Sequence, residues 1–190
     1  MRLAKIIVIK DASGSMSRLK NRKSYEIYCS LKDNLSLLYR DKLLPTNIIL
    51  HTTKVEHCVT PVLPSIEEEF FNLGYGCGTY ISPALTCCRE IFVEKNKDID
   101  YYIFHCTDGD CWGEDIDLAI EEMKKIANKA QLYIYNEVKF STYTSYLIEA
   151  ISSNQIENLV ITPKVTRMDA DMAKNFFLKT IVSKRCNNNL

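Results

Sequence analysis

The feature that most constrains the fold is a short, unbroken apolar run near the start of the chain. Ile6, Ile7, Val8 and Ile9 follow one another without a polar residue, and Lys10 closes the run. A strand covered on both faces needs apolar side chains on both, whereas a half-exposed strand alternates apolar and polar residues. We therefore predict a buried strand over residues 4–10 in a sheet with helices on both faces.

Short apolar runs and longer helical patterns alternate along the rest of the chain. We expect further strands near 48–50, 55–59, 101–106, 132–135 and 159–161, and helices over 17–39, 82–94, 115–129, 145–151 and after Asp169. The tight link at Thr53-Lys54 implies an antiparallel hairpin. The pattern predicts a doubly wound, Rossmann-like α/β fold, with a mostly parallel sheet and one antiparallel edge strand. We expect a single domain over residues 1–186 and a frayed tail over 187–190.

Apolar residues recur at helical spacing in the first and last of these helices. The first stripe is Tyr28, Leu31, Leu35 and Leu38, and the last is Met172, Phe176, Phe177 and Ile181. We expect both stripes to be buried. Ser82, directly before Pro83, is the expected N-cap of the helix over 82–94.

Composition excludes some classes of function. The 24 basic and 24 acidic residues give a formal net charge of zero, whereas a nucleic-acid-binding domain usually carries a basic excess. No apolar run is long enough to cross a membrane, and the N-terminal run is too short for a signal peptide and lacks a cleavage site. The eight cysteines form no CxxC pair. We therefore expect reduced thiols and a cytoplasmic location.

Oxygen-bearing side chains gather where strands are expected to end. The first strand runs into Asp11-Ala12-Ser13-Gly14-Ser15, which places a carboxylate and two hydroxyls at alternate positions before a helix. Thr79 precedes the helix over 82–94, and Asp108 follows the strand over 101–106. Ligands of open α/β sheets bind at the carboxyl ends of strands, and hard oxygen ligands suit Mg²⁺, with Mn²⁺ as a substitute. We predict a metal site formed by Asp11, Ser13, Ser15, Thr79 and Asp108.

This order of DxSxS, threonine and aspartate resembles the metal-ion-dependent adhesion site (MIDAS) of von Willebrand A (vWA) domains. The resemblance covers nearly the whole chain and implies the strand order 3-2-1-4-5-6. It also implies that Ser13 and Ser15 bind the metal directly, that Thr79 and Asp108 bind it directly or through water, and that Asp11 acts through water. One coordination position would stay open for an acidic side chain of a partner.

A narrower resemblance rests on four segments. His51-Thr52-Thr53, Glu67–Phe71, Gly78–Leu85 and Thr107–Trp112 are similar to bacterial vWA proteins of the YeaH/YhbH type, which are linked to stress and sporulation. The resemblance implies partnership with a serine protein kinase of AAA+ type. Members of that group are commonly longer, with an N-terminal extension, and carry two glycines before the threonine where this chain has Gly76-Cys77-Gly78.

The expected chemistry favours binding over turnover. Mostly neutral hydroxyl ligands leave the metal with positive character, and the pattern places no histidine or lysine to activate a nucleophile. We expect no enzymatic activity, but a Mg²⁺-dependent module that binds an Asp or Glu of a protein partner, with no small-molecule substrate and no membrane. Two alternatives stay open: a Mg²⁺-dependent phosphoesterase, and a nucleic-acid-binding domain that uses Arg18, Lys20, Arg22 and Lys23.

Residues beside the predicted site have two interpretations each. The basic cluster that starts at Arg18 would steer an acidic partner or form the solvated start of a helix. Trp112 would anchor an interface or pack against the sheet. Asp110 and Glu114 are candidates to orient the metal ligands. We take Arg18 and Trp112 as the partner-binding candidates.

Histidines and cysteines suggest a second metal site. His105, Cys106, Cys111 and Cys77 offer N and S ligands for Zn²⁺ at the same sheet edge. Adjacent strand residues such as His105 and Cys106 point to opposite faces, so packed thiols are the preferred interpretation. His51 and His57 flank the hairpin, either as cross-strand neighbours or as residues of a polar face.

Overall fold

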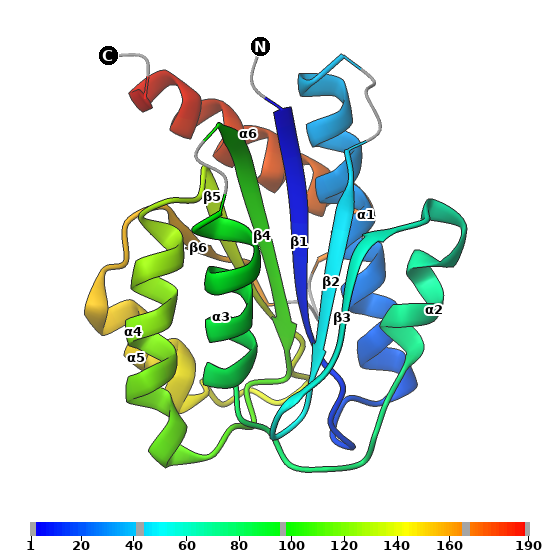
Figure 1. Ribbon diagram of the computed structural model, residues 1–190, viewed down its shortest axis with the longest axis vertical. Coiled ribbons are helices and arrows are strands. Elements are labelled where there is room, and N and C mark those ends of the chain that lie inside the picture. Colours follow the sequence, from blue (N-terminus) through cyan, green and yellow to red (C-terminus); the bar gives the residue numbers. More distant parts are fainter. Residues whose placement is uncertain (1–2, 41–43, 96–97, 165–167, 189–190) are drawn as a thin grey trace.

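A twisted sheet lies between two layers of helices in the computed structural model, which describes residues 3–40, 44–95, 98–164 and 168–188 (Figure 1). Its strands are β1 (Leu3–Asp11), β2 (Thr46–His51), β3 (Val55–Val62), β4 (Ile99–Thr107), β5 (Leu132–Glu137) and β6 (Leu159–Ile161). Their order is β3-β2-β1-β4-β5-β6, and β2–β3 is the antiparallel pair in an otherwise parallel sheet. The predicted fold class, the antiparallel edge and the strand order are confirmed.

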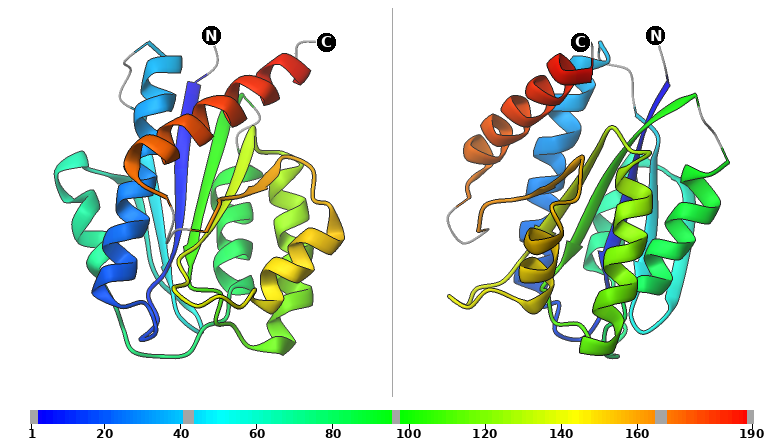
Figure 2. Two further views of the ribbon diagram at one scale, coloured as in Figure 1. Left: turned by 180° about the vertical axis from the view of Figure 1, so that it is seen from behind. Right: turned by 90° about the vertical axis from the view of Figure 1, so that its left-hand side faces the viewer.

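The helices form two layers on opposite faces of the sheet (Figure 2). They are α1 (Arg18–Leu38), α2 (Glu67–Asn72), α3 (Ser82–Cys88), α4 (Ile116–Ala127), α5 (Tyr146–Asn154) and α6 (Ala170–Asn188), and a π turn, η2 (Arg89–Val93), extends α3. Two 3-10 turns, η1 (Pro64–Ile66) and η3 (Gly113–Asp115), precede α2 and α4. Helix α6 includes residues 187–188 of the expected frayed tail, and residues 189–190 lie outside the described part.

The unbroken apolar run of β1 is buried on both sides. Ile6 and Val8 belong to the core under α1, α2 and α6, which includes Tyr28 and Leu31 of α1. Ile7 and Ile9 belong to the core under α3, α4 and α5. Burying both faces of one strand requires two helical layers, so this run dictates the sandwich.

Two local expectations are wrong. Ser82 is the first residue of α3 rather than its N-cap, because the Asp115 carboxylate of η3 accepts hydrogen bonds from the Ser82 backbone N–H (3.0 Å), the Ser82 hydroxyl and the Ile81 N–H. A carboxylate distant in sequence thus takes the place of the local cap. Met172 is 49% exposed, since the buried stripe of α6 runs through Ala173, Phe177 and Ile181.

None of the helices in the described residues is long and apolar enough to cross a bilayer.

Candidate metal centre

The carboxyl ends of the parallel strands meet at the lower edge of the sheet in Figure 1. Strands β1 and β4 pair in parallel, with Lys10 opposite Cys106, so that Asp11 and Thr107 end the two strands side by side. The Thr107 hydroxyl donates a hydrogen bond of 2.8 Å to Asp11 Oδ2. Asp108 therefore emerges directly beside the loop that follows β1.

Asp11 holds this loop in shape. Its Oδ1 accepts a hydrogen bond of 2.8 Å from the Ser13 backbone N–H, while Oδ2 accepts from Thr107. The carboxylate is fully buried. With each oxygen bonded to the protein, Asp11 acts on the site by fixing where the next residues point.

The hydroxyls of Ser13 and Ser15 converge at 3.0 Å. Two adjacent ligands of an octahedral Mg²⁺, each about 2.1 Å from the metal, lie about 3 Å apart, so this spacing fits that ion. Gly14 lies between them, and a Cβ there would come within 3.2 Å of Gly76 Cα on the neighbouring loop. The two loops therefore approach closely at Gly14, and a larger side chain there would push them slightly apart.

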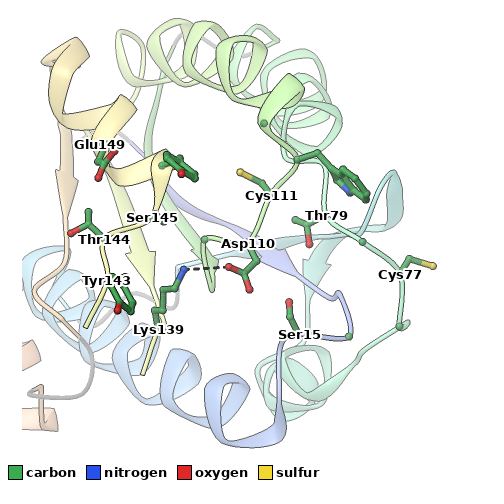
Figure 3. A pocket seen from close by; sticks show the side chains of 17 residues that line it. Ser15, Cys77, Thr79, Asp110, Cys111, Lys139, Tyr143, Thr144, Ser145 and Glu149 are labelled. Carbon is green, nitrogen blue, oxygen red and sulfur yellow. Dashed lines mark hydrogen bonds and ion pairs between the residues drawn. The ribbon is translucent and has the colours of Figure 1, made fainter. Parts of the chain in front are cut away.

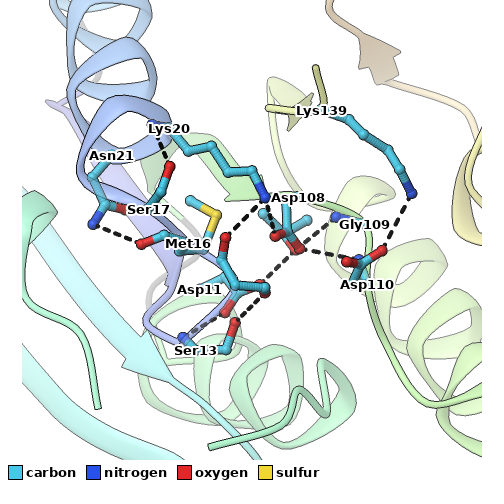
Figure 4. A network of polar contacts seen from close by, with 12 residues as sticks. Asp11, Ser13, Met16, Ser17, Lys20, Asn21, Asp108, Gly109, Asp110 and Lys139 are labelled. Carbon is cyan, nitrogen blue, oxygen red and sulfur yellow. Dashed lines mark hydrogen bonds and ion pairs between the residues drawn. The ribbon is translucent and has the colours of Figure 1, made fainter. Parts of the chain in front are cut away.

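Asp108 contributes the second carboxylate and is almost completely buried, with 1% of its surface exposed. Its Oδ1 accepts a hydrogen bond from the Asp110 backbone N–H (3.1 Å), and its Oδ2 accepts one from Lys20 Nζ (2.7 Å; Figure 4). Lys20 was predicted as a member of a surface cluster, and the structure brings it into the site instead. Its place, one turn into the helix after the DxSxS loop, is the one signal in the sequence for this contact.

An open pocket of about 1030 Å³ lies beside this cluster, and Ser15 and Thr79 are the predicted ligands that line it. Ser15 and Thr79 point toward one another across it, and the Asp110–Lys139 ion pair (3.2 Å) lies on its other side (Figure 3). Thr79 is otherwise buried, with 3% of its surface exposed. The pocket continues past the strand ends to the loop before α5 and to the first turn of that helix.

A family described as "Protein of unknown function (DUF444)" matches residues 2–183 of this chain. The chain belongs to the DUF444 family. Two similar relatives are UPF0229 proteins, one from Ruminiclostridium cellulolyticum (34% identical over 137 residues, 71% of this chain and 32% of the relative) and one from Clostridium perfringens (31% over 144 residues, 75% and 34%). This DUF444 chain thus spans about a third of the length of these relatives.

Solved structures show the same fold. A von Willebrand factor type A protein from Catenulispora acidiphila superposes with a TM-score of 0.63 at 15% identity, covering 95% of this chain and 43% of that one. An aerotolerance-related membrane protein from Bacteroides fragilis gives a TM-score of 0.62 at 12% identity, covering 95% and 99%. At these identities the likeness concerns the fold alone, and it places the DUF444 chain among vWA-type folds.

The basic cluster at the start of α1 divides in the DUF444 structure. Arg22 and Lys23 both pair with Glu26, each at 3.2 Å, while Lys20 turns into the site. Arg18 is exposed at the first position of the helix. Of the four basic residues, Lys20 alone is bonded to a predicted metal ligand.

Trp112 lies over the loop rather than on the sheet. It is 56% exposed, and a Cβ on Gly78 would come within 2.8 Å of its indole nitrogen. Its ring centroid is 6.3 Å from that of Tyr80, whose hydroxyl bonds to the Glu114 carboxylate. Glu114 therefore braces Tyr80, and Asp115 is the carboxylate that holds the chain just after Thr79.

The proposed Zn²⁺ ligands do not converge. Cys106 is buried under the α1 layer, whereas Cys77 is exposed on a loop. His105 lies on the opposite face from Cys106, and its Nδ1 bonds to the Tyr133 hydroxyl at 2.8 Å. Among the described residues, no three histidine, cysteine or acidic side chains form a cluster that would hold a metal. The seven cysteines with described side chains are free thiols.

His51 is buried, so its assignment to a polar face is wrong. It lies beside Asp11 in the β1–β2 register, under the segment that carries Tyr80, whose carbonyl is 3.0 Å from its Nδ1. Burial lowers the pKa of both His51 and His105. His57, on β3, is exposed and opposite Leu50.

Glu137 is a residue of this region that the sequence pattern did not indicate. It ends β5, and its Oε2 accepts hydrogen bonds from the Tyr135 hydroxyl (3.0 Å) and the Ser145 hydroxyl. Burial raises its pKa. The carboxylate packs directly against Gly109, the residue after Asp108, which adopts a φ of +78°. Because Gly109 has no Cβ, the Glu137 carboxylate at the end of β5 can pack against the Asp108 loop, and glycine also tolerates the positive φ at this position.

Proposed function

We propose that this DUF444 domain is a Mg²⁺-dependent protein-binding module whose metal takes an Asp or Glu side chain of a partner. The observation that carries the proposal is that Ser15 and Thr79 line one open pocket, while Ser13 and Asp108 are hydrogen-bonded to its lining residues Ser15 and Asp110. The ligands would be Asp11, Ser13, Ser15, Thr79 and Asp108, as in the MIDAS motif that the sequence resembles. Mn²⁺ is expected to substitute for Mg²⁺.

The charges around the site support an anionic partner. When bound, Mg²⁺ would supply a positive charge and an open coordination position. The chain offers it three neutral hydroxyls and two carboxylates, one of which, Asp11, already uses both oxygens in bonds to the protein. Such a ligand set leaves the site receptive to a further carboxylate.

The rim of the pocket supports a macromolecular partner. Tyr143 and Tyr146 are 80% and 81% exposed at its α5 end, and Trp112 is exposed at the opposite end. Exposed tyrosine and tryptophan side chains are typical anchors of protein interfaces. Trp112 and the exposed Arg18 remain the proposed partner contacts from the sequence, and an AAA+ type kinase remains the partner class implied by the resemblance.

Binding without turnover fits the remaining side chains. His51 and His105 are fully buried with lowered pKa values, so neither is placed to exchange a proton with a ligand in the pocket. Lys139, on the pocket wall, is paired with Asp110 at 3.2 Å, and Lys20 is paired with Asp108 at 2.7 Å. We propose that the domain is not an enzyme.

Calorimetric titration with Mg²⁺ and Mn²⁺ tests this function. Wild-type protein is expected to bind one ion saturably, and Ser15→Ala, which removes a ligand hydroxyl from an exposed loop, should weaken binding about tenfold or more. Thr144→Ala is the matched control, because it removes a hydroxyl from the far side of the same pocket. Folded wild-type protein that shows no saturable binding at millimolar Mg²⁺ would refute the proposal.

The partner is tested with the same variants. Metal-loaded wild-type protein and Thr144→Ala should retain a partner that EDTA releases, whereas Ser15→Ala should not. A partner that binds equally in EDTA would place the interaction on another surface.

A further inference from the structure

Lys20 places a positive charge inside the predicted metal site. Its Nζ lies 2.7 Å from Asp108 Oδ2 and 2.8 Å from the Ser15 carbonyl oxygen (Figure 4). The Lys20 side chain is 19% exposed, whereas that of Asp108 is 1% exposed. The ammonium therefore reaches inward from solvent to a buried carboxylate, on a residue that belongs to the first turn of α1.

The oxygen that Lys20 bonds is the one that a metal would need. Asp108 Oδ1 accepts the Asp110 backbone N–H at 3.1 Å, which leaves Oδ2 as the oxygen that bonds a side chain. Lys20 also bonds Ser15, the residue that carries one of the two converging hydroxyls. An ammonium and a divalent cation in contact with the same oxygen repel one another strongly in a buried setting.

The charge balance explains why a lysine belongs there. Asp11 and Asp108 together carry two negative charges, and a buried carboxylate without a compensating cation is unfavourable. Lys20 offsets the charge of Asp108 in the metal-free site. The same lysine becomes excess positive charge once a divalent ion is bound.

We propose that Lys20 is a tethered competitor of the metal: its ammonium bonds Asp108 in the metal-free protein and must leave this carboxylate when Mg²⁺ binds. Lys20 thereby sets the metal affinity of the site. This inference rests on the proposed function, because it requires that the site bind Mg²⁺.

Lys20→Met tests the competition, with Lys23→Met as the matched control. Both substitutions remove one positive charge from the start of α1, but Lys23 pairs with Glu26 and not with a predicted ligand. In calorimetric titrations at about 0.15 M ionic strength, where distant charges are screened, Lys20→Met should bind Mg²⁺ about tenfold more tightly than wild type. Lys23→Met should match wild type.

The outcomes separate this inference from the proposed function. If wild type and Lys20→Met bind Mg²⁺ with equal affinity, the competition is wrong and the metal site stands. If wild type, Lys20→Met and Lys23→Met are all folded and none binds Mg²⁺, the proposed function fails as well. If Lys20→Met binds Mg²⁺ and folded wild type does not, the competition by Lys20 is supported and the proposed Mg²⁺-dependent function of the wild-type protein fails.

A measurement on wild-type protein avoids any effect of substitution on folding. Acetylation of surface lysines, followed by mass spectrometry, reports how accessible each ammonium is. Reactivity of Lys20 should rise when Mg²⁺ is added, while that of Lys23 stays constant. A Lys20 reactivity that is identical in EDTA and in saturating Mg²⁺ would overturn the proposal.

Discussion

The two loops that supply the carboxylates of the candidate site are held in opposite ways. At the end of β1, Asp11 accepts hydrogen bonds from two neutral donors, the Ser13 N–H and the Thr107 hydroxyl, both at 2.8 Å. In the loop after β4, Asp108 accepts one backbone N–H and one charged side chain, Lys20. The first carboxylate is bonded to fixed parts of the fold, and the second to a group that can swing away.

This difference assigns the two aspartates different tasks. Asp11 cannot release its partners without reshaping the loop that aims Ser13 and Ser15. Asp108 can exchange Lys20 for another cation while its loop stays in place, because Glu137 and the Asp110 N–H support that loop independently. Of the two predicted carboxylate ligands, Asp11 therefore fixes the shape of the site, and Asp108 exchanges its bonding partner when a cation binds.

Asp11→Ala should give the largest loss of stability. It leaves two buried donors without an acceptor, and such losses cost about 2–4 kcal/mol in the free energy of unfolding. Urea unfolding in EDTA measures this loss without any contribution from metal. In the same buffer, Asp108→Ala should lower the free energy of unfolding by only about 1 kcal/mol, because the Lys20 ammonium is then hydrated by solvent.

Asp11→Asn is the control for this comparison, because the amide oxygen still accepts one of the two hydrogen bonds. Its loss should fall between those of wild type and Asp11→Ala. Equal losses of unfolding free energy for Asp11→Ala and Asp108→Ala would contradict the view that Asp11 holds its loop in shape whereas Asp108 does not.

Gly109→Ala should be the next most damaging change. Gly109 has a φ of +78°, and a Cβ there would overlap the buried Glu137 carboxylate. Backbone strain and the overlap together should cost about 1–3 kcal/mol, measured by urea unfolding. Gly14→Ala meets Gly76 Cα at 3.2 Å, a contact that a small loop shift relieves. If Gly14→Ala proves more damaging than Gly109→Ala, the β1 loop is the more tightly packed of the two.

The parts of this molecule that could be predicted from sequence are those set by local pattern. The unbroken run of β1 and the alternation of strands and helices predicted the mostly parallel sheet, and the tight link at Thr53-Lys54 predicted its antiparallel edge. The strand order came from the resemblance to vWA domains and not from local pattern. Apolar spacing was less decisive for α6, where Met172 faces solvent and Ala173 occupies the buried stripe, because an apolar residue beside a stripe cannot be told from a member of it.

Contacts between distant residues account for what could not be predicted. Asp115 replaces Ser82 as the cap of α3 across 33 residues, and Lys20 reaches Asp108 across 88. Both contacts depend on how the loops pack against one another in the folded protein. The spacing of apolar residues along the chain carries no information about that packing. The same limit hid Glu137, whose role depends on a close contact with Gly109.

The smallest expected effect is a dependence on pH that comes from Glu137. Burial raises the pKa of this carboxyl in the folded protein, so the folded state binds its proton more tightly than the unfolded state does. Stability from this group is therefore present at low pH and is lost as pH rises above the unfolded value of about 4.3 and through the folded pKa.

Glu137→Gln, which keeps an acceptor for Tyr135 and Ser145, removes the titration. The stability of this variant relative to wild type should rise between acidic and neutral pH, by less than about 1.4 kcal/mol for each pH unit. A constant difference across that range would mean that the support of the Asp108 loop is not linked to the charge of Glu137.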